Sequence, residues 1–550
     1  MSLPLSPAQE GLWFMQRLEP LSTAYHLARA FHLRGPLDVA ALEQALNVVR
    51  ARQAVLRTCF IERDGQPLQV AGSHFDVRVP MSDLSVHVDG ERDAALSAAL
   101  AHERQQPFDL AADGAARLCI FRMSADWHVL SVVVHHLVSD GGSNAIFARE
   151  LADAYGAIVR NEASTARPAL TWQYADFAGW QRAERTSDKG RADLAWWTGY
   201  LGARQDVFEL PADFVRTAAS ERTAHTHTFT LKDSTVAAVR ARCKAERCTS
   251  FVALMAAWQL LLSRHSGRDD FCIGVPTSGR LREECEELIG LFVDTQVYRA
   301  RLHPSMTGRA LLDAVRSDTR AALDHNGVTL AAVVDALGVR READRHPLFQ
   351  TLFNVQGASA AGALSLEGLD VEIVDFESPA ARFDLSFDVR IAADAVTCTA
   401  RYDSSLYHAE TIARLGRHYE ALLVGLCDAP ERAVAGIEFI DEDELAQLSV
   451  WSASPSRYEP FAGVHELFSR EALRHPSAVA LVYGEAVLTY AELESRANRL
   501  AHFLIGRGVG PEVRVGIGVE RSVEMVVGLL AILKAGGAYV PLDPEYPAER

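Results

Sequence analysis

The sequence predicts a multidomain protein of the mixed α/β class, because three of its properties point the same way. The chain has 550 residues, which is too long for one ordinary domain and suggests about three or four units. Its 49% hydrophobic and 23% charged residues are typical of a globular protein with ample core. Strand-like and helix-like segments alternate in the first third and again over about residues 225–435, which predicts an α/β (α+β) fold.

Hydrophobic periodicity locates the first elements. Residues 37–52 carry apolar side chains on one stripe, which predicts an amphipathic helix. Residues 127–134 form a nearly continuous apolar, β-branched run, typical of a strand buried on both faces. Ser143 is predicted to cap the helix that follows. A strand, a short loop and a helix start therefore follow one another here.

The second alternating region is predicted in the same way. Residues 271–275 and 291–298 predict strands, and residues 311–323 predict a helix. The polar stretch 182–191 is expected to be a connecting surface segment between the two regions.

The composition of the chain changes near Glu442. Residues 451–460 are rich in Ser and Pro and predict a linker. A new globular pattern begins around Val464 and is still running at Arg550. We therefore expect one complete region followed by the opening of another domain.

Charge and cysteine usage exclude several classes of function. The formal net charge of −17 argues against a nucleic-acid binder, which needs a basic face. The eight cysteines form no Cys-x-x-Cys pair and no cluster with zinc spacing, so we expect no metal site and a reducing compartment. No signal peptide and no apolar run of membrane-spanning length is visible, so we expect a cytoplasmic protein without a membrane partner.

Reactive side chains gather at the end of the predicted strand 127–134, in the run His135-His136-Leu-Val-Ser-Asp140-Gly141. A neutral histidine can take a proton from an attacking amine or alcohol, because its pKa lies near working pH. Strand alternation points His135 and His136 to opposite sides, so one can face a substrate while the other packs into the protein.

Asp140 has two possible roles in this run. It could orient the base directly, as in catalytic triads, or pair with an arginine and hold the loop. Gly141 allows close approach of a substrate to the main chain. For a single histidine, a purely structural role would be the better interpretation. The whole pattern is more specific, since about 10⁻³ chance matches are expected in a chain of this length.

The pattern His-His-x-x-x-Asp-Gly is the signature of nonribosomal peptide synthetase condensation domains and of related chloramphenicol acetyltransferase-like acyltransferases. Six further stretches resemble the condensation family in the same order, namely residues 6–13, 52–60, 174–180, 289–295, 344–350 and 382–385. The sequence departs from the family at Gly11, where arginine is usual, and at Gln53 and Ala54, which replace a His-Glu pair. Asp294 stands where asparagine is common.

The resemblance implies a V-shaped pseudo-dimer of two chloramphenicol acetyltransferase-like lobes with a tunnel between them. The implied domains are an N-terminal lobe over 1–178, a C-terminal lobe over 179–440, a linker over 441–463 and the truncated start of an adenylation domain over 464–550. Residues 488–493 and 533–543 resemble the first two motifs of adenylation (AMP-binding) domains. The Gly-rich phosphate loop of that family does not occur in the sequence, so we expect no adenylation activity.

The resemblance also assigns roles to the site residues. His136, His135 and Gly141 are implied to form the catalytic site. Of these, His136 is implied to be the catalytic histidine, acting as a general base or by positioning the amine. Gly141 is implied to contribute its backbone N–H or the space it leaves. Asp140 is implied to be structural and to form an ion pair with Arg280.

The implied reaction is amide bond formation in secondary metabolite and antibiotic biosynthesis. The amine of a carrier-bound aminoacyl group attacks an upstream carrier-bound acyl or peptidyl thioester. The chain itself is expected to bind no cofactor, because both substrates arrive on phosphopantetheine arms of partner carrier domains. The expected partners are a donor carrier protein in trans and the downstream adenylation and carrier domains. Two alternatives stay open, a catalytically silent platform that recruits partner proteins and a starter domain with a fatty-acyl donor.

Overall fold

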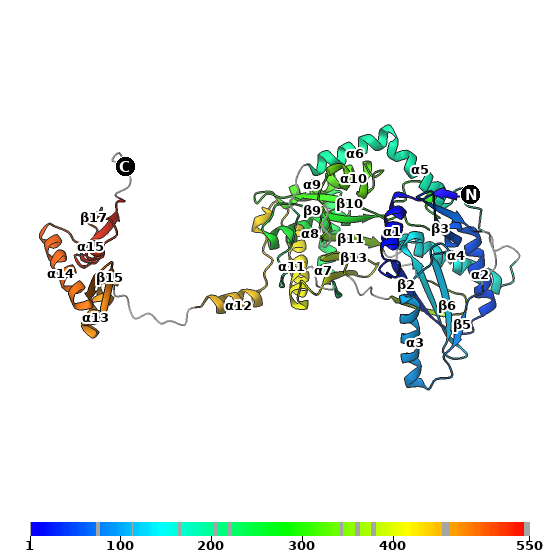
Figure 1. Ribbon diagram of the computed structural model, residues 1–550, viewed down its shortest axis with the longest axis horizontal. Coiled ribbons are helices and arrows are strands. Elements are labelled where there is room, and N and C mark those ends of the chain that lie inside the picture. Colours follow the sequence, from blue (N-terminus) through cyan, green and yellow to red (C-terminus); the bar gives the residue numbers. More distant parts are fainter. Residues whose placement is uncertain are drawn as a thin grey trace. The chain divides into compact units, whose positions relative to one another are not determined.

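The computed structural model divides the chain into two compact units, Met1–Asp441 and Glu442–Arg550 (Figure 1). The predicted mixed α/β class is confirmed, since both units contain helices and strands. The structure describes residues 2–72, 78–112, 114–162, 167–202, 207–217, 222–340, 345–357, 364–375, 381–453 and 463–543.

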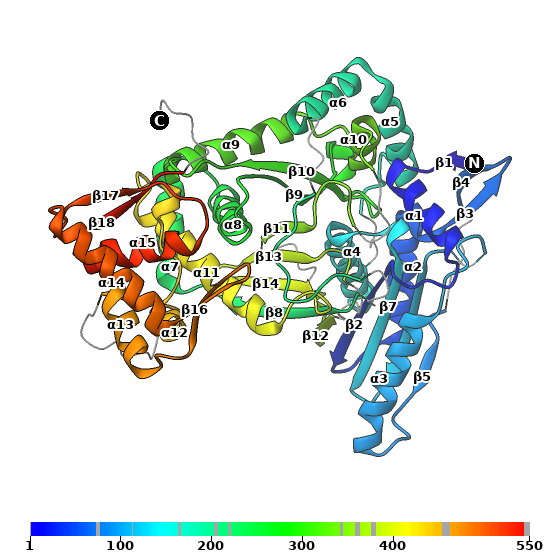
Figure 2. The ribbon, with the colours of Figure 1, turned by 60° about the vertical axis from the view of Figure 1, so that its left-hand side comes forward.

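The first unit contains a five-stranded sheet near its N-terminus. In spatial order its strands are β12 (Asp370–Asp375), β2 (His26–Arg34), β7 (Trp127–His135), β6 (Ala116–Arg122) and β5 (Met81–Asp83). The predicted strand 127–134 is confirmed as β7, which lies between β2 and β6 and pairs with both in antiparallel register. Strand β12 comes from far along the chain and pairs with β2 at the sheet edge, so the predicted N-terminal lobe receives a strand from the second half of the unit (Figure 2).

Helices cover both faces of this sheet. The predicted helix 37–52 is confirmed as α2 (Val39–Arg52), which packs with α4 (Gly141–Val159) over one face. Helix α3 (Asp89–Gln105) covers the other face. Helix α1 (Pro7–Leu18) lies against the end of β7, and a small sheet β1-β4-β3 (Ser2–Pro4, Gln66–Ala71, Thr58–Arg63) flanks it. Helix α4 begins after Asp140, so the predicted cap Ser143 is wrong, because the Asp140 side chain accepts the capping hydrogen bond.

The second half of the unit holds a six-stranded sheet. In spatial order its strands are β10 (Asp294–Arg301), β9 (Asp270–Thr277), β11 (Thr351–Gly357), β13 (Leu385–Ile391), β14 (Val396–Asp403) and β8 (Ala224–Thr230). The predicted strand 271–275 and helix 311–323 are confirmed as β9 and α9 (Gly308–Asp324). The predicted strand 291–298 begins only at Asp294, so residues 291–293 form a loop.

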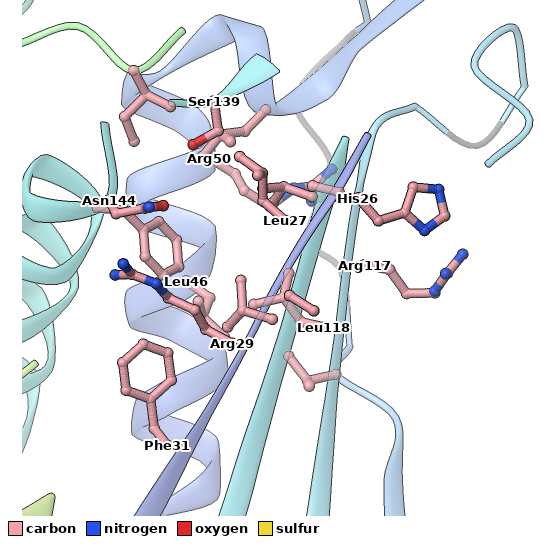
Figure 3. A pocket seen from close by; sticks show the side chains of 18 of the residues that line it. His26, Leu27, Arg29, Phe31, Leu46, Arg50, Arg117, Leu118, Ser139 and Asn144 are labelled. Carbon is pink, nitrogen blue, oxygen red and sulfur yellow. The ribbon is translucent and has the colours of Figure 1, made fainter. Parts of the chain in front are cut away.

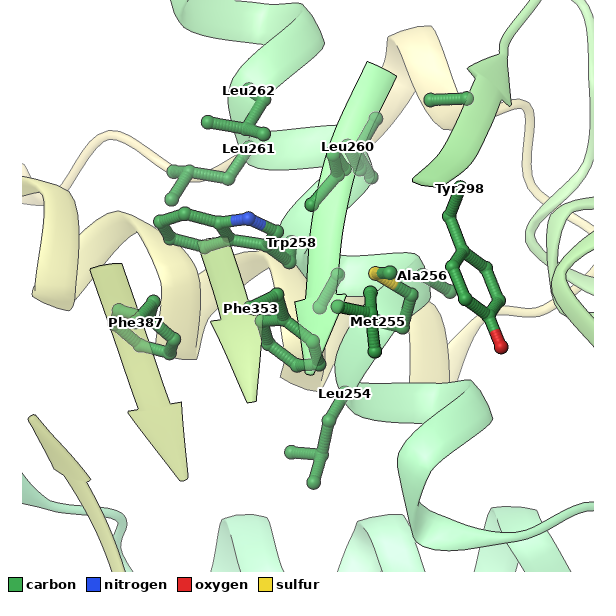
Figure 4. Packing of buried hydrophobic residues seen from close by; sticks show 14 of the residues in the cluster. Leu254, Met255, Ala256, Trp258, Leu260, Leu261, Leu262, Tyr298, Phe353 and Phe387 are labelled. Atoms are coloured by element: carbon green, nitrogen blue, oxygen red, sulfur yellow. The ribbon is translucent and has the colours of Figure 1, made fainter. Parts of the chain in front are cut away.

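The core of this half lies between the sheet and helices α7 (Asp233–Glu246), α8 (Ser250–Ser266), α9 and α11 (Ala409–Asp428). Trp258 of α8 stacks on Phe387 of β13 with ring centroids 4.5 Å apart, and Phe353 of β11 lies beside them (Figure 4). Along β13 buried residues alternate with partly exposed Ser386 and Asp388, because successive side chains point to opposite faces. The second face of the sheet is therefore polar.

The stretch 182–191 is mainly helical, so the prediction of a connecting surface segment is wrong in its detail. The stretch contains the end of α5 (Tyr174–Thr186) and the start of α6 (Asp188–Leu201), with a break at Ser187. Ser187 caps α6 by accepting a hydrogen bond from the Gly190 amide. The polar composition that suggests a connection reflects the exposed faces of two helices. The predicted lobe boundary at residue 178 falls inside α5 and stays a prediction.

The second unit is smaller and contains two two-stranded sheets. Within the predicted linker 441–463, residues Glu442–Ser452 form α12, and residues 454–462 lie outside the described part. The remaining elements are α13 (Val464–Arg474), β15 (Val479–Tyr483), β16 (Ala486–Thr489), α14 (Tyr490–Gly506), β17 (Arg514–Ile517), α15 (Val523–Lys534) and β18 (Ala538–Pro541). Strands β15 and β16 pair antiparallel, and β17 and β18 pair parallel.

Candidate active site

The motif residues lie where β7 ends and α4 begins. His135 is the last residue of β7, and residues His136–Val138 form a single 3₁₀ turn. Asp140 is the N-cap of α4, whose first residue is Gly141. The strand therefore gives way to the helix within a few residues, and the side chains of the motif point in different directions.

His135 is fully buried and both of its ring nitrogens are used inside the protein. Nδ1 accepts a hydrogen bond from the Leu137 amide at 3.1 Å, and Nε2 lies 3.3 Å from Oε1 of Gln16. Because the Gln16 oxygen can only accept, Nε2 carries the proton. Burial, together with the neighbouring His26 and His136, lowers the pKa of His135 to about 3. His135 is therefore a neutral structural group at working pH.

His136 has the opposite tautomer. Its Nδ1 lies 2.8 Å from the Ser139 carbonyl oxygen, which can only accept, so Nδ1 carries the proton. Nε2 is then unprotonated, and it has no hydrogen-bond partner among the residues that the structure describes. The side chain is partly exposed. Burial and the positive charge of Arg382 lower the pKa of His136, which keeps the ring neutral and able to accept a proton at Nε2.

Asp140 is buried and accepts hydrogen bonds with both oxygens. Oδ1 accepts from the backbone N–H and the hydroxyl of Ser143, at 2.8 and 2.7 Å. Oδ2 accepts from the amides of Phe292 and Val293, at 2.9 and 3.0 Å. These donors lie on the loop before β10, so one carboxylate joins the start of α4 to the second half of the unit. It does not bond the ring of His136, and this geometry favours the bracing role over the triad role.

Arg280 lies beside this carboxylate, with Nη2 3.6 Å from Asp140 Oδ1 and 3.1 Å from the Ser143 hydroxyl oxygen. Its Nη1 donates to the carbonyl oxygens of Cys285 and Leu288. The guanidinium also lies over the ring of Phe292, 4.1 Å from its centroid. Arg280 therefore holds the loop that supplies the two amides to Asp140.

Gly141 leaves open space at the start of α4. A Cβ atom built on it would meet no heavy atom within 4 Å among the described residues. Its backbone has no positive φ. Neither packing nor backbone conformation therefore requires glycine at this position. The open space beside it is consistent with close approach of a bound molecule.

Three glutamines that sequence analysis did not assign to the site support the motif. Gln9 Nε2 donates to the Leu137 carbonyl at 2.9 Å, and Gln16 contacts His135. Gln53 accepts from the Ile289 amide at 3.0 Å and donates to the Glu287 carbonyl and to Glu150 of α4. Gln53 stands where the family usually has histidine. Its side-chain amide links the end of α2 to α4 and to the loop before β10 by hydrogen bonds. Gln9 and Gln53 lie in the stretches 6–13 and 52–60 that resemble the family, but the sequence does not show what they contact, because their partners lie far apart in the chain.

A cavity of about 880 Å³ adjoins the motif. Ser139, Asn144 and Phe147 line it, together with residues of strands from both sheets of the first unit. Figure 3 shows Ser139 and Asn144 with the lining residues of β2 and β6. Ser139, whose carbonyl oxygen accepts the Nδ1 proton of His136, is the motif residue among the lining residues. The described residues contain no group of three His, Cys, Asp or Glu side chains that could hold a metal ion.

Residues 1–449 match the family described as condensation domain, and residues 468–550 match the family described as AMP-binding enzyme. The chain belongs to the condensation-domain family. Its C-terminal part is the start of an AMP-binding region, so the resemblance seen in the sequence is confirmed. No helix in the described part of the chain is both long and apolar enough to cross a membrane.

Curated relatives of this condensation protein are large synthetases. A linear gramicidin synthase of Brevibacillus parabrevis is 38% identical over 554 residues, which is 100% of this chain and 11% of the relative. Chondramide synthase cmdD of Chondromyces crocatus is 36% identical over 554 residues, covering 100% of this chain and 14% of the relative. The chain therefore spans only about a tenth of the length of these relatives.

Two solved structures share the fold. The X-domain from teicoplanin biosynthesis superposes with a TM-score of 0.70 at 27% identity, covering 80% of this chain and 97% of that one. A four-domain nonribosomal peptide synthetase bound to AMP and glycine has a TM-score of 0.71 at 20% identity, covering 100% of this chain and 42% of that one.

Proposed function

We propose that the first unit catalyses amide bond formation between two carrier-bound substrates. The condensation family catalyses reactions of this type, and the observation that carries the proposal is the state of His136. Its Nδ1 proton is held by the Ser139 carbonyl, and its Nε2 has a lone pair with no partner among the described residues. A neutral imidazole in that state can accept a proton from an attacking amine.

The proposed step conserves atoms and charge. The acceptor amine attacks the donor thioester carbonyl, a C–N bond forms and the C–S bond breaks. His136 Nε2 takes the proton that the amine loses and returns it to the departing thiolate. Holding two tethered reactants together supplies a further part of the acceleration. The lowered pKa of His136 suits this role, because the ring is neutral when the amine attacks.

Asp140 and Arg280 act in the proposal by holding the loop rather than by touching substrate. Asp140 ties the start of α4 to the amides of residues 292 and 293, and Arg280 holds the carbonyls of the same loop. Gly141 and the buried His135 contribute shape at the same strand end. The side chain of His136 is the one member of the motif that we assign to catalysis.

The partners in this proposal are carrier domains. The donor arrives on the phosphopantetheine arm of an upstream carrier protein in trans, and the acceptor on the arm of a downstream carrier. The chain's relatives are synthetases of peptide products, which supports a role in a cytoplasmic assembly line for a secondary metabolite. The expectation that residues 464–550 do not adenylate by themselves stays a prediction.

A second candidate function is a silent platform that recruits another protein. One observation favours it: a solved structure of the teicoplanin X-domain in complex with OxyB is similar to this chain, with a TM-score of 0.71 at 28% identity. The open Nε2 of His136 favours the catalytic proposal instead, because a platform does not need it.

One experiment separates the two candidates. The chain is mixed with an aminoacyl donor carrier and an aminoacyl acceptor carrier, and the dipeptidyl product on the acceptor is measured by mass spectrometry. We expect product with the wild type and almost none with His136→Ala. An absence of product with active carriers, together with stable capture of a purified partner enzyme, would favour the platform.

A further inference from the structure

Arg382 joins the second half of the first unit to the segment that precedes β2. Its Nη2 donates a hydrogen bond to the Ala24 carbonyl oxygen at 2.8 Å. The guanidinium group also lies over the ring of Tyr25, 5.2 Å from the ring centroid. Hydrogen bonds from a charged donor and cation–π contacts are both stronger than ordinary neutral contacts. One arginine therefore holds Ala24, which is 358 residues away in the chain, and its neighbour Tyr25.

The same segment holds the backbone of His136. The Tyr25 carbonyl oxygen accepts a hydrogen bond from the His136 amide at 2.9 Å. The next residue, His26, is the first of β2 and pairs with His135 at the end of β7. The centroid of the Tyr25 ring lies 6.3 Å from that of the His135 ring. Arg382 is therefore connected to His136 through a single residue, Tyr25.

The backbone of Arg382 is itself held on both sides. Before it, the Ala381 amide donates a hydrogen bond to the Arg222 carbonyl oxygen at 3.0 Å. After it, the buried carboxylate of Asp384 accepts hydrogen bonds from the guanidinium groups of Arg222 and Arg216. Arg382 is therefore presented to the first half of the unit from an ordered support, as the precise placement of a side chain requires.

The charges around His136 give Arg382 a second effect on the ring. Burial and the positive charge of Arg382 lower the pKa of His136, whereas Asp140 raises it. Two further titratable groups are close by, His135 on the same strand end and His26 on β2. Burial lowers the pKa of both, so they are neutral at working pH. The α1 side chains that contact the motif are uncharged glutamines. Arg382 therefore supplies a positive charge that favours the neutral form of the ring.

We propose that Arg382 is a positioning residue for His136, which holds the Tyr25 segment in place and keeps a positive charge beside the imidazole ring. The inference deepens the proposed function and rests on it, because it gives Arg382 a part in the step that His136 performs. A neutral ring with an oriented Nε2 is the form that can accept the amine proton. Arg382 and His136 come from different halves of the unit, so the ring has this neighbour only while the two halves are in contact.

The first measurement is the titration of His136 by NMR, which needs no substrate. The full chain is labelled with carbon-13 at histidine Cε1, and the His136 signal is identified as the one that is missing from His136→Ala. The signal is followed between pH 4.5 and pH 8.5 in the wild type, in the neutral variants Arg382→Gln and Arg382→Met, and in Arg382→Lys, which keeps the charge. Arg390→Gln is the matched control, because it removes an exposed positive charge from β13 that does not line the cavity.

We expect the titration midpoint of the His136 signal to move to higher pH by about half a unit or more in both neutral variants, because a nearby positive charge is lost. Arg382→Lys and Arg390→Gln should keep the wild-type midpoint. A midpoint that is unchanged in both neutral variants, or that rises equally in Arg382→Lys, would overturn the inference.

The second measurement is the pH dependence of the rate in the carrier assay. The fall in rate at low pH should move to higher pH in the neutral variants, by the same amount as the NMR midpoint. Above pH 8 the ring is neutral in every variant, so a remaining loss of rate reports its orientation. We expect kcat there to fall by about threefold to tenfold with KM unchanged, because the Tyr25 segment has lost one anchor. A kcat above pH 8 that equals the wild-type value would also overturn the inference.

The two measurements separate this inference from the proposed reaction. If the NMR midpoint rises in the neutral variants but the wild type forms no amide with active carriers, the proposed reaction fails and the contact between Arg382 and His136 stands. If the wild type forms amide and the midpoint does not change, the reaction stands and the inference fails. Circular dichroism and the thermal unfolding midpoint check that each variant is folded, and either neutral variant alone is sufficient for the test.

Discussion

The beginning and the end of the histidine motif are built in opposite ways. At the end, both oxygens of Asp140 are occupied by hydrogen bonds from Ser143, Phe292 and Val293. At the beginning, His136 uses one ring nitrogen inside the protein and leaves the other open. Asp140, whose carboxylate is fully hydrogen-bonded, therefore lies one short turn away from His136, whose Nε2 can accept a proton. The difference indicates that one part of a catalytic motif can act on substrate while the other only holds the loop.

The two adjacent histidines show the same contrast on a smaller scale. Both are neutral, but His135 carries its proton on Nε2 and His136 on Nδ1, because each faces a different fixed acceptor. The acceptor therefore decides which nitrogen stays open to a substrate. Variants for which both the rate of amide formation and the free energy of unfolding are measured test these contrasts.

The largest effect is expected for His136→Ala. Loss of a general base should lower kcat for amide formation by about 10²–10⁴-fold. The free energy of unfolding should change by less than about 1 kcal/mol, since the side chain makes a single hydrogen bond in the described structure. Rates come from the carrier assay and stability from urea titration. A variant that stays within threefold of the wild-type rate would contradict the catalytic role.

Asp140→Ala should mainly lower the stability of the protein, whereas His136→Ala should mainly lower the rate. It leaves the amides of Phe292 and Val293 without their acceptor and removes the carboxylate beside the half-buried Arg280, so we expect the free energy of unfolding to fall by about 3–5 kcal/mol. Chemical denaturation measures the loss, and Asp153→Ala on the exposed face of α4 is the control. A well-folded and fully active Asp140→Ala protein would remove the bracing role.

Arg280→Ala should have a smaller effect than loss of Asp140, because the amide bonds to Asp140 remain. We expect a cost of about 1–3 kcal/mol for the lost hydrogen bonds to the Leu288 carbonyl and the Ser143 hydroxyl. Arg280→Lys should recover only part of the lost stability, since one ammonium group cannot reach both the Leu288 carbonyl and the Ser143 hydroxyl. Equal stability of the alanine and lysine variants would show that the guanidinium geometry does not matter.

His135→Asn should change how stability depends on pH. The pKa of His135 is about 3 in the folded state against 6.5 for the free side chain, so below pH 6.5 only the unfolded chain gains this proton. The wild type should therefore lose up to about 1.4 kcal/mol per pH unit from this group as the pH falls from 6.5 towards 3. Asparagine keeps an acceptor for the Leu137 amide but cannot titrate, so its slope should be shallower. Unfolding titrations at pH 6.5, 5.5 and 4.5 compare the slopes, and parallel slopes would contradict the burial argument.

The pH dependence of the rate should show the smallest change. The base must be neutral, and the pKa of His136 lies below 6.5, so at pH 6.5 more than half of the protein is active. We expect the rate at pH 6.5 to be within twofold of the rate at pH 7.5, with the fall at lower pH. A profile that already halves above pH 6.5 would mean that this pKa is not lowered.

Local patterns in the sequence predicted the elements that carry the site. The apolar run 127–134 and the amphipathic stretch 37–52 became β7 and α2, because period and burial are properties of neighbouring residues. Capping was less predictable. Aspartate and serine are both common N-cap residues, so the sequence allows Asp140 or Ser143 in this position. Asp140 is the N-cap, and its carboxylate also accepts hydrogen bonds from the amides of residues 292 and 293.

The class of the fold, the family and the position of His136 at a strand end could all be predicted from the sequence, since they follow from local periodicity and a short motif. Three features depend on the tertiary structure. It determines that Nε2 of His136 is the nitrogen without a partner, and that Oδ1 of Asp140 binds α4 whereas Oδ2 binds the loop before β10. It also brings arginines from two sheets to one cavity. Proton positions and cavity linings depend on groups far apart in the chain, and a linear pattern does not record which distant groups meet.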